Sequence, residues 1–390
     1  MVRKDLKGST ENPKQENKAS CWPRLLCMIE DHSAIVSLPN VPKFHRLNVS
    51  NKTRWPPALF YSTRIFYIQT SFQQSSQPNT SYIINPSLKM ANHLNTLLTP
   101  SLLDKLVNAK LPFSMTEPLN FDHVGQQQFR APPPLPSEIS SLVWPVLKTL
   151  SKLGLSSIPN LLQFLPPVTA SNFPIQALGL QLLLDQMSRA LFQGIDRRWG
   201  PAYFDIISLQ YAQTLDALPE HEKPWSWSRW KTFATLDYWV LARTWYICPF
   251  VHSDERSSQE RALLFTEETR RAVEEETGTI DPYRAERDAI LSDMHGVHRM
   301  IKEGPPGGGS TVYTYAYWMC KLMDIHKPVV DTFGRYPYRN AYFGRENTVE
   351  EEAWAEERGG ISMPSEELKS WLKQDIDAGV WTPLGAGRSA

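Results

Sequence analysis

Apolar residues recur with the period of an α-helix from residue 138 almost to the end of the chain. Glycine or proline interrupts this pattern at intervals, and no series of alternating, strand-like segments accompanies it. The pattern is clearest in one apolar stripe whose members lie three or four positions apart: Leu180, Leu183, Leu184, Met187 and Leu191. The sequence therefore predicts an all-α protein.

Punctuation by glycine and proline divides the pattern into separate helices joined by short connections. Thr99 followed by Pro100 predicts one further helix start upstream of residue 138. Short connections favour antiparallel helical hairpins, stacked in a bundle or superhelix, although no regular sequence repeat accompanies them. We expect helices at about 138–153, 174–193, 201–217, 226–250, 255–277, 284–303, 310–332, 348–358 and 364–378.

The first 89 residues differ in composition from the rest. They contain 12 Lys and Arg but 5 Asp and Glu, which leaves 29 and 36 of the chain's 41 and 41 for the remainder. Acidic residues are missing from His32 to Leu103, and Ser, Asn and Pro are frequent there. Such a composition buries too little apolar surface to offset the entropy of ordering. We predict that residues 1–89 form a disordered extension.

This extension could be an upstream addition to a protein whose translation starts at Met90. A transit peptide is the alternative, which the acidic residues Asp5, Glu11 and Glu16 oppose. We divide the rest into an amphipathic helix with a proline-rich linker (90–137), one helical domain and a tail. The helical domain is expected over residues 138–380, and the tail over 381–390.

Several classes of function are disfavoured by composition. The part of the chain after residue 89, called the acidic body here, has more Asp and Glu than Lys and Arg. A negatively charged surface binds a phosphate backbone poorly, so we expect no nucleic-acid partner. No run of about 18 uncharged apolar residues predicts a membrane span. The four cysteines form no C-x-x-C pair and fit a reduced, cytoplasmic setting.

Two stretches that resemble metal or cofactor motifs are incomplete. "MHGVH" places His295 and His298 on one helix face, but a third zinc ligand is missing from its surroundings. "GPPGGGS" lacks the G-K-[ST] ending of a phosphate-binding loop. We therefore predict no metal and no cofactor.

Three polar stretches interrupt the apolar helices. They read "LLLDQMSRALFQG" (182–194), "CPFVHSDERSSQE" (248–260) and "FGRYPYRNAYFGR" (333–345). Together they resemble the domain of unknown function 924 family, over roughly residues 170–358. The family pattern is L-L-L-D-Q-F-P-R-N, then Y-x-P-x-x-H-S-E-D with a following Q-E, then H-x-x-x-x-x-R-F-G-R-F-P-H-R-N-x-x-L-G-R, then S/T-x-E-E. The matching residues include Asp185, Arg189, His252, His326, Arg335, Arg339, Asn340 and Arg345.

The chain departs from that pattern at several positions. Ser188 and Ala190 replace the Pro and Asn of the first stretch, Asp254 stands where Glu is usual, and Tyr338 replaces the His of the third. The resemblance implies a tetratricopeptide-like, all-helical fold in bacterial and fungal proteins. It implies no activity.

Arg335, Arg339 and Arg345 raise the question of which groups they contact. Gly334 and Pro337 predict a helix end followed by a turn, where guanidinium groups can bind carboxylates in bidentate pairs. One interpretation is an internal ion-pair network with acids such as Asp185, Asp254 and Glu255. Another is a pocket for the acid group of a small ligand. Nucleic-acid stacking on the nearby tyrosines is a third, which the acidic body opposes.

His252 and His326 are the candidate proton-transfer groups, because imidazole titrates near neutral pH. A hydrogen-bonding role in the structure is the alternative for both. Ser253, next to His252, is interpreted as the N-cap of the following helix rather than as a nucleophile, because no G-x-S-x-G elbow presents it.

The leading functional hypothesis is a protein that binds, and could transform, a small polar or anionic organic molecule. Positive charge would come from Arg189, Arg335, Arg339 and Arg345, and Asp185, Asp254 and Asn340 would orient the ligand and the histidines. An accessory enzyme of fungal secondary metabolism is one compatible setting. The alternative is a non-catalytic, tetratricopeptide-like interaction module.

Overall fold

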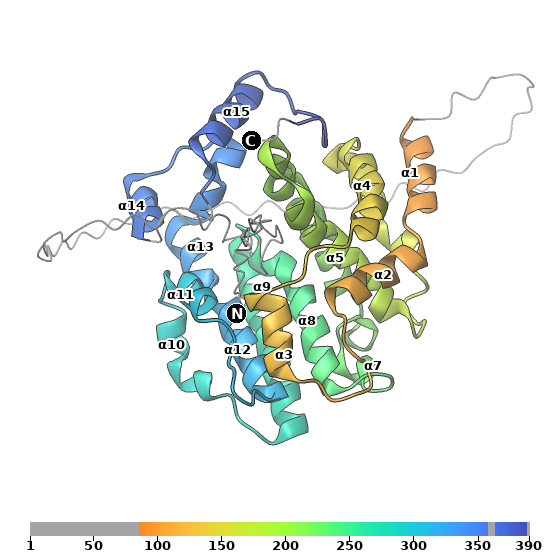
Figure 1. The fold of residues 1–390 in the computed structure, drawn as a ribbon, viewed down its shortest axis with the longest axis vertical. Helices are drawn as coiled ribbons and strands as arrows, with labels where there is room; N and C mark the ends of the chain where they lie inside the picture. The colour runs from red at the N-terminus through yellow and green to blue at the C-terminus, as the bar shows by residue number, and fades with distance from the viewer. Residues whose placement is uncertain (1–85, 358–362, 388–390) are drawn as a thin grey trace, which may run out of the picture. The chain divides into compact units, whose positions relative to one another are not determined.

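The computed structural model describes residues 86–357 and 363–387. Every regular element in these ranges is a helix, as Figure 1 shows, which confirms the predicted all-α class. The predicted disordered extension, residues 1–89, lies outside the described residues as far as residue 85. Its last four residues begin helix α1 (Pro86–Leu97).

The other helices follow in chain order. The α-helices are α2 (Pro100–Lys110), α3 (Phe121–Gly125), α4 (Ser137–Ser151), α5 (Phe173–Leu191), α6 (Asp205–Asp216), α7 (Trp227–Trp230), α8 (Leu236–Val251), α9 (Arg256–Thr277), α10 (Arg287–Ile290), α11 (Gly296–Glu303), α12 (Val312–Asp324), α13 (Lys327–Phe333), α14 (Val349–Glu357) and α15 (Glu366–Asp377). Short 3₁₀ or π segments are η1 (Gln126–Arg130), η2 (Leu155–Ser157), η3 (Leu161–Phe164), η4 (Gly194–Arg198), η5 (Gly200–Phe204), η6 (Glu220–Glu222), η7 (Pro282–Glu286) and η8 (Pro337–Phe343).

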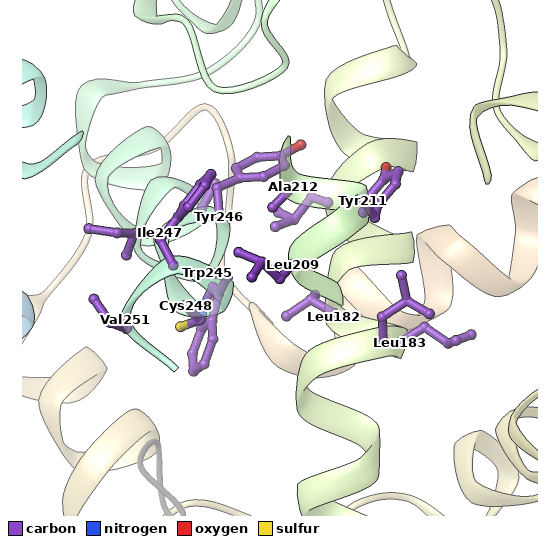
Figure 2. Packing of buried hydrophobic residues seen from close by; sticks show 14 of the residues in the cluster. Leu182, Leu183, Leu209, Tyr211, Ala212, Trp245, Tyr246, Ile247, Cys248 and Val251 are labelled. Atoms are coloured by element: carbon purple, nitrogen blue, oxygen red, sulfur yellow. The ribbon is translucent and has the colours of Figure 1, made fainter. Parts of the chain in front are cut away.

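Helix α8 lies at the centre of the packed helices. Every residue from Tyr238 to Val251 is buried, because the helix contacts α5, α6, α9 and α12 on different sides. Its sequence is correspondingly apolar all round, as expected of a helix without a solvent-facing side. Figure 2 shows side chains of α8, such as Trp245 and Ile247, beside those of α5 and α6.

Helix α2 packs closely against α5 at a glycine. Ideal Cβ geometry at Gly179 would place the added atom 2.5 Å from the carbonyl oxygen of Leu103. The small residue therefore lets the two backbones approach. Leu103 belongs to the same hydrophobic core as residues from α4 and α8. The domain boundaries proposed at residues 137 and 380 stay predictions.

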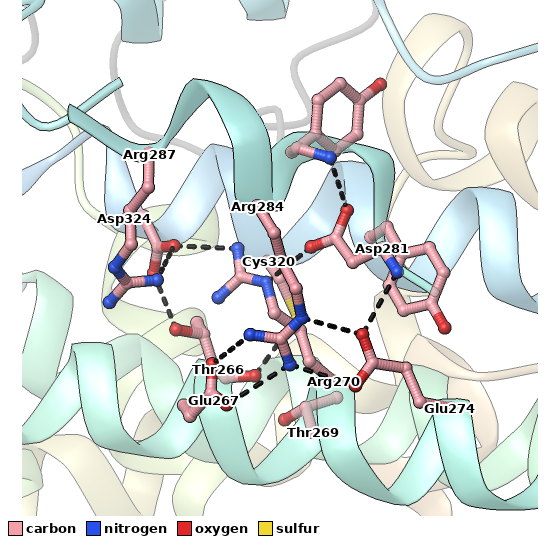
Figure 3. A network of polar contacts seen from close by, with 12 residues as sticks. Thr266, Glu267, Thr269, Arg270, Glu274, Asp281, Arg284, Arg287, Cys320 and Asp324 are labelled. Atoms are coloured by element: carbon pink, nitrogen blue, oxygen red, sulfur yellow. Dashed lines mark hydrogen bonds and ion pairs between the residues drawn. The ribbon is translucent and has the colours of Figure 1, made fainter. Parts of the chain in front are cut away.

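A buried ion-pair cluster joins α9 to η7 and α12. Arg270 on α9 contacts Asp281 at 2.5 Å and Asp324 at 2.7 Å, so one guanidinium bridges two carboxylates from different segments. Nearer the surface, Arg284 of η7 pairs with Glu274 of α9 at 2.8 Å. Figure 3 shows these contacts. They fix the connection between α9 and α12, where apolar packing alone would allow sliding.

Two of the helices expected to be continuous are each divided in two. The segment expected at 226–250 forms α7 and α8, because Thr235 caps a new helix by accepting a hydrogen bond from the backbone N–H of Tyr238. The segment expected at 310–332 forms α12 and α13, because Pro328 has no N–H to continue the helical ladder.

The segment expected at 284–303 also divides, into η7, α10 and α11. The Asp293 carboxylate accepts from the backbone N–H of His295 and forms a turn before α11 begins at Gly296. An added Cβ at Gly296 would lie 1.9 Å from Cδ1 of Ile325, so a larger residue here would require the Ile325 side chain to move.

Two predicted helix ends, at Thr99 and Gly334, are confirmed by a hydrogen bond and by backbone angles. The Thr99 hydroxyl accepts from the backbone N–H of Leu102 at the start of α2. Gly334 ends α13 with a φ of 69°, in the left-handed region that glycine favours. Thr348 and Glu351 form the reciprocal hydrogen bonds of a capping box at the start of α14.

The C-terminal helix α15 packs against η8 and η4. Its contacts form a small apolar cluster, separate from the main core, made of Ile195, Tyr342, Leu368 and Leu372. The finer prediction of a tetratricopeptide-like superhelix stays a prediction. Among the described residues, no helix has the length and apolar character that crossing a bilayer requires.

Replacing Gly179 by alanine should destabilise the protein. The new methyl group would push against the α2 backbone, and overpacking of this kind costs about 1–3 kcal/mol, more than the roughly 1 kcal/mol gained in helix propensity. Gly154→Ala is the control, because nothing lies within 4 Å of its added Cβ. Urea unfolding should show a lower free energy for Gly179→Ala alone, and equal stability of the two variants would contradict the close approach.

Candidate functional site

Six of the nine predicted site residues lie in one buried polar network. The network joins the end of α5, the start of α6, the end of α8 and the segment η8. Its members are Asp185, Arg189, Asp205, His252, Asp254, Arg339 and Arg345, and every link between them is an ion pair or hydrogen bond. His252 of the second stretch is thus linked to Arg339 of the third only indirectly, through Asp185, Arg189 and Asp205.

Asp185 and His252 form the innermost pair of this network. The imidazole Nδ1 lies 2.9 Å from Asp185 Oδ1, and both residues are buried. Burial opposes ionisation of Asp185, but Arg189 and His252 together hold its pKa below the ordinary value. An ionised carboxylate only accepts hydrogen bonds, so Nδ1 of His252 carries the proton and Nε2 carries the lone pair. Gln186 donates to the other carboxylate oxygen.

Asp205 connects two arginines from distant segments. Arg189 contacts both of its carboxylate oxygens, at 2.7 and 3.0 Å, and Arg339 donates to it at 2.9 Å. All three side chains are nearly inaccessible to solvent. A buried charge is tolerable only when it is paired, so these three groups depend on one another.

Asp254 continues the network towards the surface. It lies 3.7 Å from Arg339 and 3.3 Å from Arg345, and it accepts from the backbone N–H of Tyr336. The neighbouring Ser253 is not the N-cap of α9 as predicted, because the helix begins later, after Glu255. The Ser253 hydroxyl instead accepts from the N–H of Glu255.

Arg335 and Asn340 belong to a second cluster around Glu351. Arg335 makes a bidentate pair with this carboxylate at 2.7 and 2.9 Å, and Asn340 donates to it at 3.0 Å. This cluster joins η8 to the start of α14. Glu255, offered as an arginine partner, instead accepts from Ser258.

His326 has different surroundings from His252. Its Nδ1 donates to the carbonyl oxygen of Leu322 at 2.8 Å, and the residue is buried at the N-terminus of α13. This contact fixes the junction between α12 and α13. The proton-transfer role predicted for His326 stays a prediction.

A pocket of about 400 Å³ lies against the outer side of the network. One wall comes from η8 and the turn after it, and includes Tyr338 and Arg345. The other wall comes from α15 and includes Lys369 and Lys373. Tyr338 is nearly buried, and its ring centroid lies 5.7 Å from the Arg339 guanidinium, so this side chain lies against both the pocket and the inner part of the network. Burial raises the pKa of its phenol, which therefore stays protonated.

One cluster among the described residues has ligand atoms close enough together for a metal ion. These atoms, from Asp185, Cys248 and His252, lie within 4.8 Å of one another. The surroundings oppose metal binding, because Arg189 lies 3.4 Å from the Asp185 carboxylate and burial raises the pKa of the Cys248 thiol. Cys248 and Cys320 are buried free thiols.

Sequence reasoning missed Asp205 and the pairing role of Glu351. Asp205 stands between Phe204 and Ile206 in the segment expected to be helical from 201 to 217. An acidic residue within an apolar helical pattern is a signal of a buried, paired charge.

Residues 160–359 match the family model described as bacterial protein of unknown function (DUF924). The matched segment is slightly more than half of the 390 residues and contains the whole polar network. The chain belongs to the DUF924 family. No curated protein and no solved structure matches it. The three motifs of this DUF924 chain thus correspond to the helix ends that carry the network.

Removing Arg339 from the DUF924 network should destabilise the protein strongly. Arg339→Ala would leave Asp205 and Asp254 with fewer buried partners, and such a loss costs about 3–5 kcal/mol. Arg345→Ala is the matched control, because its side chain is 35% exposed and it pairs with a single carboxylate. We expect at most about 1 kcal/mol there. Urea unfolding measures both, and equal losses would argue against the buried network.

Stability of this DUF924 chain should fall as the pH drops below about 6.5, the ordinary pKa of histidine. Burial, assisted by Arg189, lowers the pKa of His252, so the folded protein keeps it neutral while the unfolded chain takes up a proton. The slope from one such group reaches about 1.4 kcal/mol per pH unit. Arg189, Asp185 and Asp205 are the ionisable groups that act on this histidine.

His252→Asn is the test of this pH dependence. The asparagine amide can donate to Asp185 in place of Nδ1 but cannot take up a proton. Urea unfolding of wild type and variant between pH 5 and 7.5 should give a shallower slope for the variant. Parallel slopes would show that His252 does not titrate differently in the two states.

Proposed function

We propose that this protein binds a small anionic or polar organic molecule in the pocket between η8 and α15. The observation that supports this proposal is the position of the cations. Arg345 and Lys369 line the pocket from opposite walls, and each side chain is about one third exposed. Partial burial strengthens attraction to an anion, while the remaining exposure leaves room for one to approach.

The acids that line the pocket lie on its exposed parts. Glu346, Glu352 and Asp377 are solvent-exposed, and Asp377 already pairs with Lys373 at 3.1 Å. Exposed charges are screened by water, so they repel an anion less than the inner cations attract it. A ligand with an acid group at its inner end and a polar outer end fits this distribution of charge.

Arg189 and Arg339 have a supporting role in this proposal. Both are engaged with Asp205, so a ligand would have to displace a buried carboxylate to reach them. Arg345 keeps one longer contact, to Asp254 at 3.3 Å. It can exchange this contact for a ligand carboxylate at a smaller cost. The network then serves as the rigid base on which Arg345 and Tyr338 are held.

We also propose proton transfer by His252, at a position separate from the pocket: the imidazole is buried in the inner part of the network and does not line the pocket, so its substrate would have to reach that inner part. Its protonated Nδ1 is held by Asp185, its Nε2 has the lone pair of a base, and its lowered pKa keeps it neutral at physiological pH. We propose the cytoplasm as the location, which the two buried free thiols support. An accessory reaction on an organic acid in fungal secondary metabolism is the setting that we propose.

A panel of mono- and dicarboxylic acids with two to six carbons tests the binding proposal. Saturation-transfer NMR and isothermal titration should detect at least one of them on the full chain. Arg345→Ala should weaken that acid about tenfold or more, the loss of one charge-assisted hydrogen bond in a partly buried site.

Arg256→Ala is the control for this experiment, because its side chain is 70% exposed and does not line the pocket. It should bind the acid as wild type does. If no acid binds, or if Arg345→Ala binds as tightly as Arg256→Ala, the pocket is not an acid site. The interaction-module alternative would then gain, since the arginines would have only internal partners.

A further inference from the structure

The pocket has walls of two different origins. The η8 wall lies inside the segment that matches the DUF924 model, which ends at residue 359. The α15 wall, Glu366–Asp377, lies beyond that segment. A site closed in this way receives its second wall from a part of the chain that the family model does not describe.

We propose that α15 selects the ligand and that Lys369 is the selecting residue, for a small dicarboxylic acid. This inference rests on the proposed function, because it concerns the same pocket. Arg345 would bind one carboxylate and Lys369 the other. The ligand class is narrower than a small organic acid, because both inner cations must be satisfied at once.

Helix α15 is held firmly enough to define such a wall. Leu368 and Leu372 anchor it to η8 and η4 in the small apolar cluster. Ile376 lies so close to Gly344 that an added Cβ there would be 2.9 Å from it. The two walls therefore touch at one edge of the pocket, which fixes the distance between the cations that they carry.

The segment after α15 fastens the helix a second time. Arg198 of η4 donates to the carbonyl oxygen of Val380 at 2.9 Å, and Trp199 donates to that of Thr382 at 3.0 Å. The Arg198 guanidinium lies 4.2 Å from the centroid of the Trp381 ring, and this ring packs against that of Trp199 at an angle of 56°. Anchoring on both sides keeps α15 in place at the edge of the pocket.

Two lysines of α15 line the pocket one helical turn apart, and they differ in depth. The Lys369 side chain is 35% exposed, and its partner Glu366 is almost fully exposed. Lys373 is 76% exposed and pairs with Asp377. Because water screens the outer lysine more, the inner one contributes more to binding an anion. Lys373 is therefore a matched control on the same helix.

Succinate, glutarate and adipate, each with its monoamide and diamide, form the test series. An amide keeps the shape of the carboxylate and removes its charge. On wild type, titration calorimetry should give about three- to tenfold weaker binding for the monoamide than for the diacid. This is the loss of affinity expected when one partly exposed ion pair between ligand and protein is removed. Lys369→Ala should bring this ratio close to one, and Lys373→Ala should preserve it.

The outcomes separate this inference from the proposed function. If Arg345→Ala weakens the diacid but Lys369→Ala leaves the diacid-to-monoamide ratio unchanged, the selecting role of α15 is wrong and the acid site stands. If no member of the series and no acid of the panel binds wild type, both fail. Urea unfolding of Lys369→Ala verifies that the variant is folded, and Lys369→Arg should restore the preference for the diacid.

Discussion

Mutual neutralisation of buried charges is the constraint on which the rest of this structure depends. Three carboxylates and three guanidinium groups alternate from Asp185 to Arg345, and each one on its own would be costly to remove from water. They come from α5, α6, the turn after α8, and η8. Because every member needs a partner from another segment, the network forms only when these helix ends are in place together.

This dependence explains why polar motifs stand at the ends of apolar helices. The apolar side chains of α5 and α8 bring the two helices together but do not by themselves determine how far one helix is shifted along the other. The network supplies that information: Asp185 meets His252 only in one register of α5 against α8. Arg270 has the equivalent role between α9, η7 and α12. Buried polar contacts of this kind contribute specificity of packing as well as stability.

Much of the helical architecture could be predicted from the sequence, because helix periodicity and caps are local signals. Thr99 and Gly334 fixed helix ends correctly for that reason. The helices around Thr235 and Pro328 were expected to be continuous, since a cap or a proline inside an apolar pattern leaves the periodicity unchanged. Local pattern alone cannot decide whether such a residue kinks a helix or divides it.

The site was predictable in its members but not in its pairings. Arg335, Arg339 and Arg345 share one stretch of sequence, yet they have different partners: Glu351, Asp205 and Asp254. Which acid each one meets depends on packing between distant segments, and sequence spacing carries no signal of it. The apolar pattern around Asp205 signals that its charge is buried and paired, but not that Arg189 and Arg339 are the partners, because packing between distant segments determines them.

The different partners also determine which arginine is available for function. Arg339 holds two acids in a buried position, so its loss would affect the fold before any ligand. Arg345 pairs with Asp254, which also contacts Arg339, and it lines the pocket. Its charge is therefore already partly neutralised on the side away from the pocket. A ligand carboxylate bound to Arg345 would therefore weaken the ion pair between Arg345 and Asp254. The Asp254 carboxylate would then pair with Arg339 alone. Ligand binding at Arg345 would therefore be coupled to a stronger ion pair between Asp254 and Arg339.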